Sequence, residues 1–384
     1  MKQSTKRILT THVGSMPRPQ EVVDFLFAED QGPLTAEQRS QYDEVMTRNV
    51  SEIVAAQKRS RVDIPSDGEM SKISYATYIR HRLTGFEIGE APRATPKDLD
   101  EFPEYRDRLA SAGGTPKYHR PICRGPIEFK DIEPLKKDIA NMKAALAEHG
   151  VEEGFMNAAS PGVVAVFQPN EFYQTHESYL EALAEVMKTE FETIAESGLL
   201  LQVDCPDLAM GRHIKFRDED DETFLKNAEM QIEALNYALE NVPSEQIRMH
   251  LCWGNYEGPH HHDINLEKIM PLVMKAKPQA IQFEASNPRH AHEWQVWAEA
   301  DIPEDKILIP GVLDTTTNFV EHPELVAERI MRFVDIVGPE RVIAGTDCGF
   351  GTFAGFGAIH PSICWAKLEA MAQGADLASQ RAYG

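Results

Sequence analysis

Two side chains that can bind a metal stand two residues apart in the segment Ile247–Asn255, which reads IRMHLCWGN. His250 and Cys252 end an apolar run that favours a strand, and side chains two apart on a strand point to the same side. An imidazole and a thiolate placed in this way can both reach one zinc ion, at roughly 2.0–2.1 Å and 2.3 Å. One such pair is a weak signal, because buried cysteines are common core residues.

Two later segments offer further ligands. Glu284 follows the apolar run Ala280–Phe283, where an ionised carboxylate is costly unless it is paired or bound to a metal. Cys348 comes shortly after the apolar residues Val342–Ala344. If these segments end at one mouth, one tetrahedral site can include His250, Cys252, Glu284 and Cys348. Two thiolates, an imidazole and a carboxylate favour Zn²⁺ over Mg²⁺ or Ca²⁺, which prefer oxygen ligands.

Short β-rich runs alternate with amphipathic stretches, and this alternation predicts how the ligands are brought together. The predicted strands are Ile8–Val13, Val62–Pro65, Gly154–Ala158, Leu199–Asp204, Ile247–Cys252, Ala280–Glu284, Lys306–Pro310 and Arg341–Ala344. Two clear amphipathic stretches are Glu177–Ser197 and Glu222–Glu240. We therefore predict an α/β protein with a (β/α)8 (TIM) barrel, whose chemistry lies at the carboxyl ends of the strands. An open doubly wound sheet is the alternative, but Thr11–Ser15 is not the glycine-rich phosphate loop that such a sheet usually carries.

One segment interrupts the alternation between the second and third predicted strands. Residues from 85 to about 150 are rich in charges and prolines and are compatible with a hairpin from Lys117 to Lys130. We interpret this segment as an insertion into one barrel domain spanning residues 1–384, rather than as a second domain.

The charge balance limits the partners of the chain. Its 384 residues include 61 acidic and 39 basic side chains, which gives a formal net charge of −22. A surface this acidic repels phosphate backbones, and no long basic patch offsets it, so we expect no nucleic-acid partner. With 42% hydrophobic and 26% charged residues, the composition is that of a globular protein.

Cysteine usage and hydropathy indicate the compartment. Five cysteines in a chain of this length do not make a disulfide framework and favour a reducing environment. The basic residues near the amino terminus are not followed by a signal-peptide apolar run, and no run of about 18 apolar residues occurs. We expect a cytoplasmic location and no membrane partner, and the sequence leaves the oligomeric state open.

The motifs together resemble those of the cobalamin-independent methionine synthase family, in particular its catalytic C-terminal barrel. The matching motifs, in the order of the family, are Thr10–Ser15, Asp67–Glu69, Ser160–Pro161, Gln202–Pro206, His250–Cys252, Glu284–Ser286, Pro310–Asp314 and Asp347–Gly349. The resemblance implies a zinc ion that activates homocysteine as its thiolate. The residues that match the zinc ligands of the family are His250, Cys252, Glu284 and Cys348.

The resemblance also implies which residues hold the amino-acid part of the thiol substrate. These are Gly14, Ser15, Glu69 and Asp204. The two carboxylates can pair with an α-ammonium group, and the N–H groups of Gly14 and Ser15 can bind an α-carboxylate. A free thiol is only partly ionised at neutral pH, whereas a thiol bound to a metal is deprotonated. We therefore expect a zinc-dependent S-methyltransferase that makes methionine from homocysteine and a small-molecule methyl donor.

The chain departs from the family in ways that leave the donor open. It has no room for the second, amino-terminal barrel of the full-length enzymes, and the segment Asp314–Asn318 lacks the catalytic histidine of the family. Asp314 and Asn318 follow a predicted strand and are our candidates for catalytic positions. The donor can be methyltetrahydrofolate or, as in short single-barrel relatives, a corrinoid.

Two other functions are compatible with the same residues. Epoxyalkane:coenzyme M transferase shares the zinc-thiolate chemistry but transfers an alkyl group by opening an epoxide. Its sulfonated thiol would need a cationic site, for which the candidates are Arg18, Arg80, Arg82, Arg124 and Arg289. A barrel that binds zinc or thiols without turnover is the third possibility, although ligands dispersed over three strand ends are unlike a structural zinc site. The triplet His260–His262 is more compatible with a solvated loop, because three adjacent residues cannot all point at one ion.

Overall fold

The computed structural model describes residues 1–89, 94–111 and 118–384. Its strands are β1 (Leu9–Thr10), β2 (Phe86–Gly89), β3 (Arg120–Cys123), β4 (Phe155–Ala159), β5 (Leu200–Asp204), β6 (Ile247–Leu251), β7 (Ala280–Phe283), β8 (Ile307–Pro310) and β9 (Ile343–Ala344). Its α-helices are α1 (Gln20–Gln31), α2 (Ala36–Arg59), α3 (Pro103–Leu109), α4 (Glu133–His149), α5 (Pro161–Phe167), α6 (His176–Glu196), α7 (Gly211–Ile214), α8 (Asp221–Ala238), α9 (Leu266–Val273), α10 (Trp294–Glu299), α11 (Pro323–Val337) and α12 (Pro361–Tyr383). The 3₁₀ turns used below are η1 (Thr77–His81) and η2 (Lys97–Glu101).

The eight predicted strands are joined in a ring of parallel pairings. Strands β4 to β8 form one continuous parallel sheet in chain order, and β1 pairs with β9. The remaining joints are single parallel bridges, namely Thr11–Ile64, Ser66–Phe155, Leu308–Val342 and Gly311–Gly345. Each predicted strand is thus bonded to the next and the last to the first, as the predicted (β/α)8 barrel requires. The second predicted strand is present only as the bridges made by Ile64 and by Ser66, the residue just after it.

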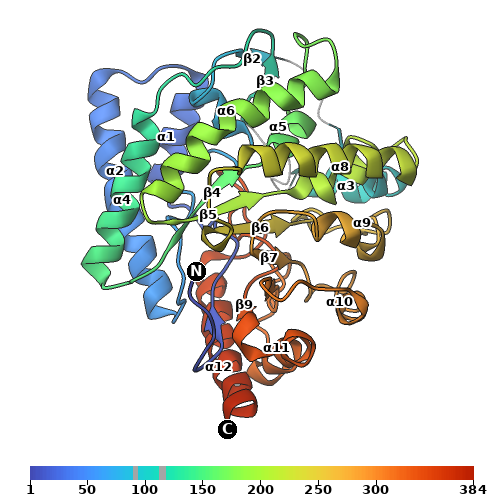
Figure 1. The fold of residues 1–384 in the computed structure, drawn as a ribbon. Coiled ribbons are helices and arrows are strands. Elements are labelled where there is room, and N and C mark those ends of the chain that lie inside the picture. Colours follow the sequence, from blue (N-terminus) through green and yellow to red (C-terminus); the bar gives the residue numbers. More distant parts are fainter. Residues whose placement is uncertain (90–93, 112–117) are drawn as a thin grey trace.

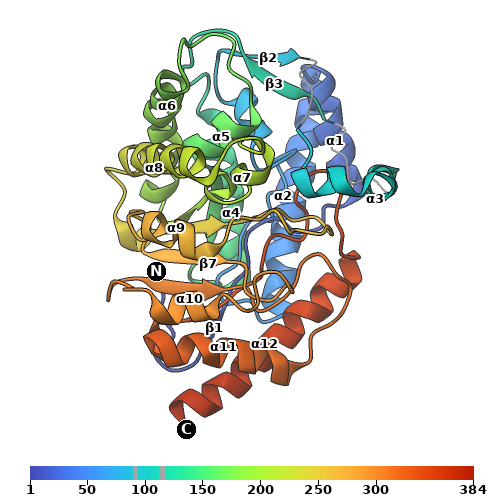
Figure 2. The same cartoon turned by 90° about the vertical axis from the view of Figure 1, so that its right-hand side faces the viewer.

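Helices surround the strands, with α2 and α4 at the left of Figure 1, α8 and α9 at its right and α11 and α12 at its bottom. The predicted amphipathic stretches form α6 and α8. Helix α6 begins with a capping box, in which the Thr175 hydroxyl accepts from the backbone of Ser178. It buries Leu183, Met187 and Phe191, which are four residues apart and therefore share one face. Helices α11 and α12 lie side by side (Figure 2), and among the described residues no helix is long and apolar enough to cross a membrane.

A layer of polar side chains fills the barrel beneath its mouth. Gln202, Arg248 and Gln282 stand on the adjacent strands β5, β6 and β7, and all three are fully buried. The Arg248 guanidinium donates to Thr11 Oγ1 at 2.8 Å, to the carbonyl of His12 at 2.7 Å and to Gln282 Oε1. Because side chains alternate along a strand, the residues two positions further on also face the barrel axis, closer to its mouth.

The hairpin predicted from Lys117 to Lys130 is wrong, and its first residue lies outside the described residues. Strand β3 instead pairs antiparallel with β2, and the chain after it runs along residues 82–85. Pro121 and Pro126 have no N–H to donate, so this segment bonds through other N–H groups, such as that of Arg124 to Gly85. The last part of the predicted insertion forms α4, which packs against α2.

Candidate metal centre and cavity

Two cysteines and a histidine meet at the carboxyl ends of the strands. His250 lies near the end of β6, Cys252 follows that strand, and Cys348 follows β9. The two Sγ atoms are 3.3 Å apart, and they and one ring nitrogen of His250 all lie within 4.8 Å of one another. All three side chains are buried. The expectation that separate strand ends bring these residues together is therefore matched by the geometry.

Glu284 lies beside the sulfur atoms but is held by other groups. Its Oε1 is 3.7 Å from the Cys348 Sγ and accepts a hydrogen bond from the Trp253 N–H at 2.7 Å. Its Oε2 accepts from Asn287 Nδ2 at 2.7 Å. The carboxylate therefore sits at the edge of the three-ligand cluster and has oxygen lone pairs to offer to an ion.

Asp347 fixes the backbone around this carboxylate. Its Oδ1 accepts from the N–H groups of Ala285 at 2.9 Å and Ser286 at 3.0 Å, and its Oδ2 accepts from the N–H of Asn287 at 2.9 Å. One side chain from the segment after β9 thus orders the turn after β7. Its place beside Cys348 in the sequence suggests that Asp347 orients a metal ligand, but its three backbone partners could not be predicted.

A small cavity opens beside the cluster. The described residues that line it are Val13, Ser15, Glu69, Tyr75, Asp204, Pro206, Met210, His250, Cys252, Asn255, Cys348, Gly349 and Thr352. It includes three of the four predicted substrate residues and three of the four predicted metal ligands. Tyr75, Met210, Asn255 and Thr352 were missed, because they come from loops with no motif of their own.

The two acidic residues of the cavity differ in their hydrogen bonding. Asp204 accepts from Asn157 Nδ2 at 3.0 Å and from Gln202 Nε2 at 3.0 Å, and it lies 3.5 Å from His250 Nδ1. Glu69 has a buried Oε2 with no hydrogen-bond partner among the described residues. Burial, and then the charge of Asp204, raises the pKa of Glu69 to about 8. Glu69 also has a positive φ of 55°, a strained conformation for a residue with a side chain.

Gly14 and Ser15 follow Val13, whose carbonyl accepts hydrogen bonds from Asn157 on β4 and Gln202 on β5. The φ of Gly14 is 146°, and a Cβ there would lie 2.2 Å from Asn157 Oδ1, so the position requires glycine. The Gly14 N–H already donates to His12 Nδ1 at 3.1 Å. Of the predicted carboxylate-binding pair, only Ser15 lines the cavity.

The predicted catalytic residues Asp314 and Asn318 are not brought to the cavity. Asp314 accepts at 2.8 Å from the N–H of Thr316, and so caps its own turn. Asn318 is exposed and accepts from the N–H of His360 at 3.0 Å. The loop that carries them reaches the cavity wall instead through Thr315, whose hydroxyl donates to Asn255 Oδ1 at 2.9 Å.

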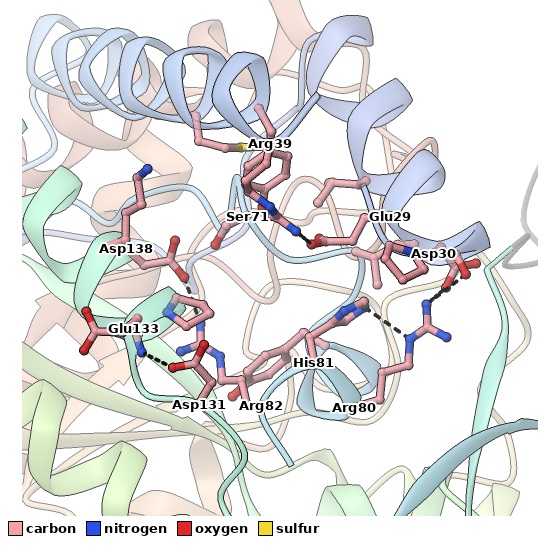
Figure 3. Close-up of a pocket in the computed structure, with 18 of the residues that line it drawn as sticks. Glu29, Asp30, Arg39, Ser71, Arg80, His81, Arg82, Asp131, Glu133 and Asp138 are labelled. Carbon is pink, nitrogen blue, oxygen red and sulfur yellow. Dashed lines mark hydrogen bonds and ion pairs between the residues drawn. The ribbon is translucent and has the colours of Figure 1, made fainter. Parts of the chain in front are cut away.

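A larger cavity, of about 880 Å³, lies elsewhere, between α1, α2, η1 and α4 (Figure 3). Its arginines are already paired with acids. Arg80 contacts Asp30 at 2.5 Å and Arg82 contacts Asp138 at 2.8 Å. None of the predicted metal-binding, substrate-binding or catalytic residues lines it, and Arg80 and Arg82, two candidates for a sulfonate site, are engaged in these ion pairs.

Comparison with known proteins assigns the family. The model of the family described as "Cobalamin-independent synthase, Catalytic domain" matches residues 105–363. The chain belongs to this family. The match spans the sulfur cluster and Glu284, whereas Gly14, Ser15 and Glu69 lie before it.

Relatives of the cobalamin-independent synthase family match almost the whole chain. A methionine synthase from Sulfurisphaera tokodaii is 23% identical over 88% of this chain and 85% of its own length. A methionine synthase from Saccharolobus solfataricus is 23% identical over 95% of this chain and 93% of its own length. The fold is similar to that of a B12-independent methionine synthase from a Shewanella species in complex with selenomethionine, with a TM-score of 0.71, 16% identity and 98% of both chains covered. A putative B12-independent methionine synthase from Listeria monocytogenes has a TM-score of 0.63 with 18% identity, over 96% of this chain and 98% of that one.

The donor set of this synthase-family barrel fits a zinc ion. Burial raises the pKa of Cys348 well above its usual range, so two thiols at this depth stay neutral unless a cation compensates them. A divalent ion that accepts sulfur and nitrogen ligands supplies that compensation, and Glu284 offers an oxygen from the edge.

Proposed function

We propose that the protein is a zinc-dependent methyltransferase that methylates the sulfur of homocysteine to give methionine. The observation that carries the proposal is the juxtaposition of two groups in one cavity. The sulfur cluster of His250, Cys252 and Cys348 lies at one part of its wall, and the carboxylates of Glu69 and Asp204 lie at another. An amino acid that ends in a thiol has the two functional groups that this arrangement can bind.

His250, Cys252, Cys348 and Glu284 would hold the zinc ion. Bound there, zinc supplies the positive charge that keeps a substrate thiol ionised at neutral pH. Glu284 is the ligand best placed to give way to an incoming thiol, because hydrogen bonds from Trp253 and Asn287 already stabilise its charge.

The amino-acid part of the substrate is oriented by the carboxylates. The unpaired Oε2 of Glu69 accepts a hydrogen bond from the α-ammonium group, and Asp204 adds a second negative charge nearby. Ser15 offers a hydroxyl to the α-carboxylate from the same cavity. These contacts hold the sulfur in one orientation, which lowers the entropic cost of the transfer.

Two observations bear on the remaining alternatives. No lysine or arginine is among the described residues that line the cavity, and Arg18, one of the candidates for that cation, donates to the carbonyls of Glu69 and Gly351. A sulfonated thiol such as coenzyme M therefore finds no cation there. A corrinoid donor has no support in a family described as cobalamin-independent.

The test is turnover of the purified protein with homocysteine and each of two methyl donors, methyltetrahydrofolate and methylcobalamin. A third reaction contains coenzyme M and an epoxide. We expect methionine from homocysteine and no product from the third reaction. Product in the third reaction alone would reject homocysteine as the acceptor, and no product in any reaction with a zinc-loaded protein would reject the methyltransferase.

A further inference from the structure

A second cluster of metal-binding side chains lies at the surface, apart from the sulfur cluster. His261 Nε2 is 3.0 Å from Glu101 Oε2, and His262 Nε2 is 2.5 Å from Glu101 Oε1. One ligand atom from each residue lies within 4.8 Å of the others. We call Glu101, His261 and His262 the surface triad.

The two histidines converge because of the turn before them. His260 has a φ of 54°, in the left-handed region, and points its own ring inward, where Nδ1 is 2.9 Å from Asp263 Oδ2. The next two residues form a turn and send both rings outward to the same carboxylate. Their ring centroids are 4.3 Å apart. The expectation that the three adjacent histidines cannot all point at one target holds, because His260 turns to Asp263 while His261 and His262 share Glu101.

The turn that carries the third ligand is held in place by contacts other than those of the Glu101 carboxylate. Asp98, which is buried in the same turn η2 as Glu101, accepts from the Tyr256 hydroxyl at 2.9 Å and from the His260 N–H at 2.8 Å. Phe102 packs edge-on against His261, with ring centroids 5.9 Å apart. These contacts fix η2 against the loop that carries the histidines, so little ordering remains to be done when an ion binds.

We propose that the surface triad is a second metal site, which binds one Zn²⁺-like transition-metal ion through His261 Nε2, His262 Nε2 and a carboxylate oxygen of Glu101. Two imidazoles and one carboxylate are ligands that zinc accepts, and the exposed side leaves a position for water. The site would need no cysteine and no substrate. It therefore stands or falls independently of the proposed methyltransferase activity.

The position of the triad gives the ion a structural role. Glu101 belongs to the insertion, and the histidines belong to the loop that follows β6 at its carboxyl end and lines the cavity through Asn255. The hydroxyl of Tyr105 in α3 reaches the same loop at the carbonyl of Glu257. An ion shared by segments 160 residues apart would fasten the insertion to the mouth, and a cross-link that closes a long loop restricts the unfolded chain strongly.

The experiment counts metal ions in the full chain, purified without a polyhistidine tag and loaded with one equivalent of zinc. Further Zn²⁺ is titrated in by equilibrium dialysis. We expect the wild type to bind two ions per chain, the double variant His261→Ala/His262→Ala to bind one, and Glu101→Gln to bind the second at least about tenfold more weakly. His292→Ala, which removes another exposed histidine, is the matched control and should keep both ions.

Two further results separate this site from the sulfur cluster. Cys252→Ser should lose the buried ion and still bind one ion at the triad, and it should bind none when combined with the double histidine change. With Co²⁺, the ion bound at the triad should lack the intense near-ultraviolet bands of thiolate ligands. A wild type that binds only one ion, or a double histidine variant that still binds two, would overturn the proposal.

Discussion

The sulfur cluster and the surface triad are built from similar ligands in opposite surroundings. Both join residues far apart in the chain, and both place a histidine beside an acidic residue. The sulfur cluster is buried beneath the barrel mouth, whereas the side chains of Glu101, His261 and His262 are 52%, 36% and 32% exposed. The two clusters therefore differ in how far water stabilises the charges of their ligands.

For this reason the pKa of Glu69, in the buried cavity, and the pKa of Glu101, in the surface triad, shift in opposite directions. Burial raises the pKa of Glu69, so its negative charge is costly until a cation arrives. Hydrogen bonds from His262 and His261 lower the pKa of the exposed Glu101, whose charge is already satisfied. The difference indicates that a cation bound in the buried cavity relieves an unfavourable charge, which is useful for binding and catalysis. An ion bound at the surface triad can only add stability.

The largest effect should come from removing a sulfur ligand. We expect Cys252→Ser to lose zinc at the buried site and to lower kcat/KM for methyl transfer at least about 1,000-fold, because several kcal/mol of charge stabilisation disappear. Metal analysis and initial rates measure both quantities. Cys364→Ser, at a buried thiol in α12, is the control and should keep zinc and activity. A Cys252→Ser protein of normal activity would contradict the claim that the sulfur cluster, unlike the surface triad, is required for catalysis.

A smaller effect is expected from Asp347→Asn. The asparagine keeps one acceptor oxygen but places an amide N–H₂ group against backbone N–H groups of the turn after β7. We expect zinc affinity at the buried site to fall about 10–100-fold, with the fold retained, since residues that orient metal ligands have effects of this size. Competition with a zinc chelator measures the affinity. Asp335→Asn, at an exposed position of α11, is the control, and equal affinities in the two variants would contradict a positioning role.

The smallest effect concerns pH. Below about pH 8 the free protein holds Glu69 protonated, and an α-ammonium group binds better to its ionised form. The affinity for methionine should therefore rise with pH, by at most about tenfold per unit, and level off above pH 8. Calorimetry between pH 6.5 and 8.5 measures this, and proton release on binding should accompany it. Glu69→Gln should bind methionine weakly at every pH, and an unchanged slope in that variant would assign the titration to another group.

The alternation of side chains along strands made much of the molecule predictable. On β6 it places Arg248, His250 and Cys252 on one side, and the same rule on the neighbouring strand aligns Gln202 with Asp204. Eight alternating strand and helix units then predicted the barrel, and eight motifs in the order of one family implied the residues of the sulfur cluster. These predictions depended only on local pattern and on the geometry of a closed sheet.

Positions set by loop conformation could not be predicted in this way. Asp314 looked catalytic because it follows a strand, yet its carboxylate turns back to cap residues of its own loop. Asn255 and Thr352 line the cavity from loops whose conformation depends on contacts with each other. The pairing of β2 with β3 likewise joins segments separated by residues of no recognisable pattern.

The ring of strands also constrains how the protein is made. Leu9 pairs with Ile343, and the Arg248 side chain holds Thr11 and His12 from inside the barrel. During synthesis the first strand must therefore wait, unpaired on one edge, until the ribosome has released the last one. Late, long-range pairing of this kind slows folding and leaves strand edges exposed meanwhile. Dependence on a molecular chaperone during translation would be a direct cost of this closure.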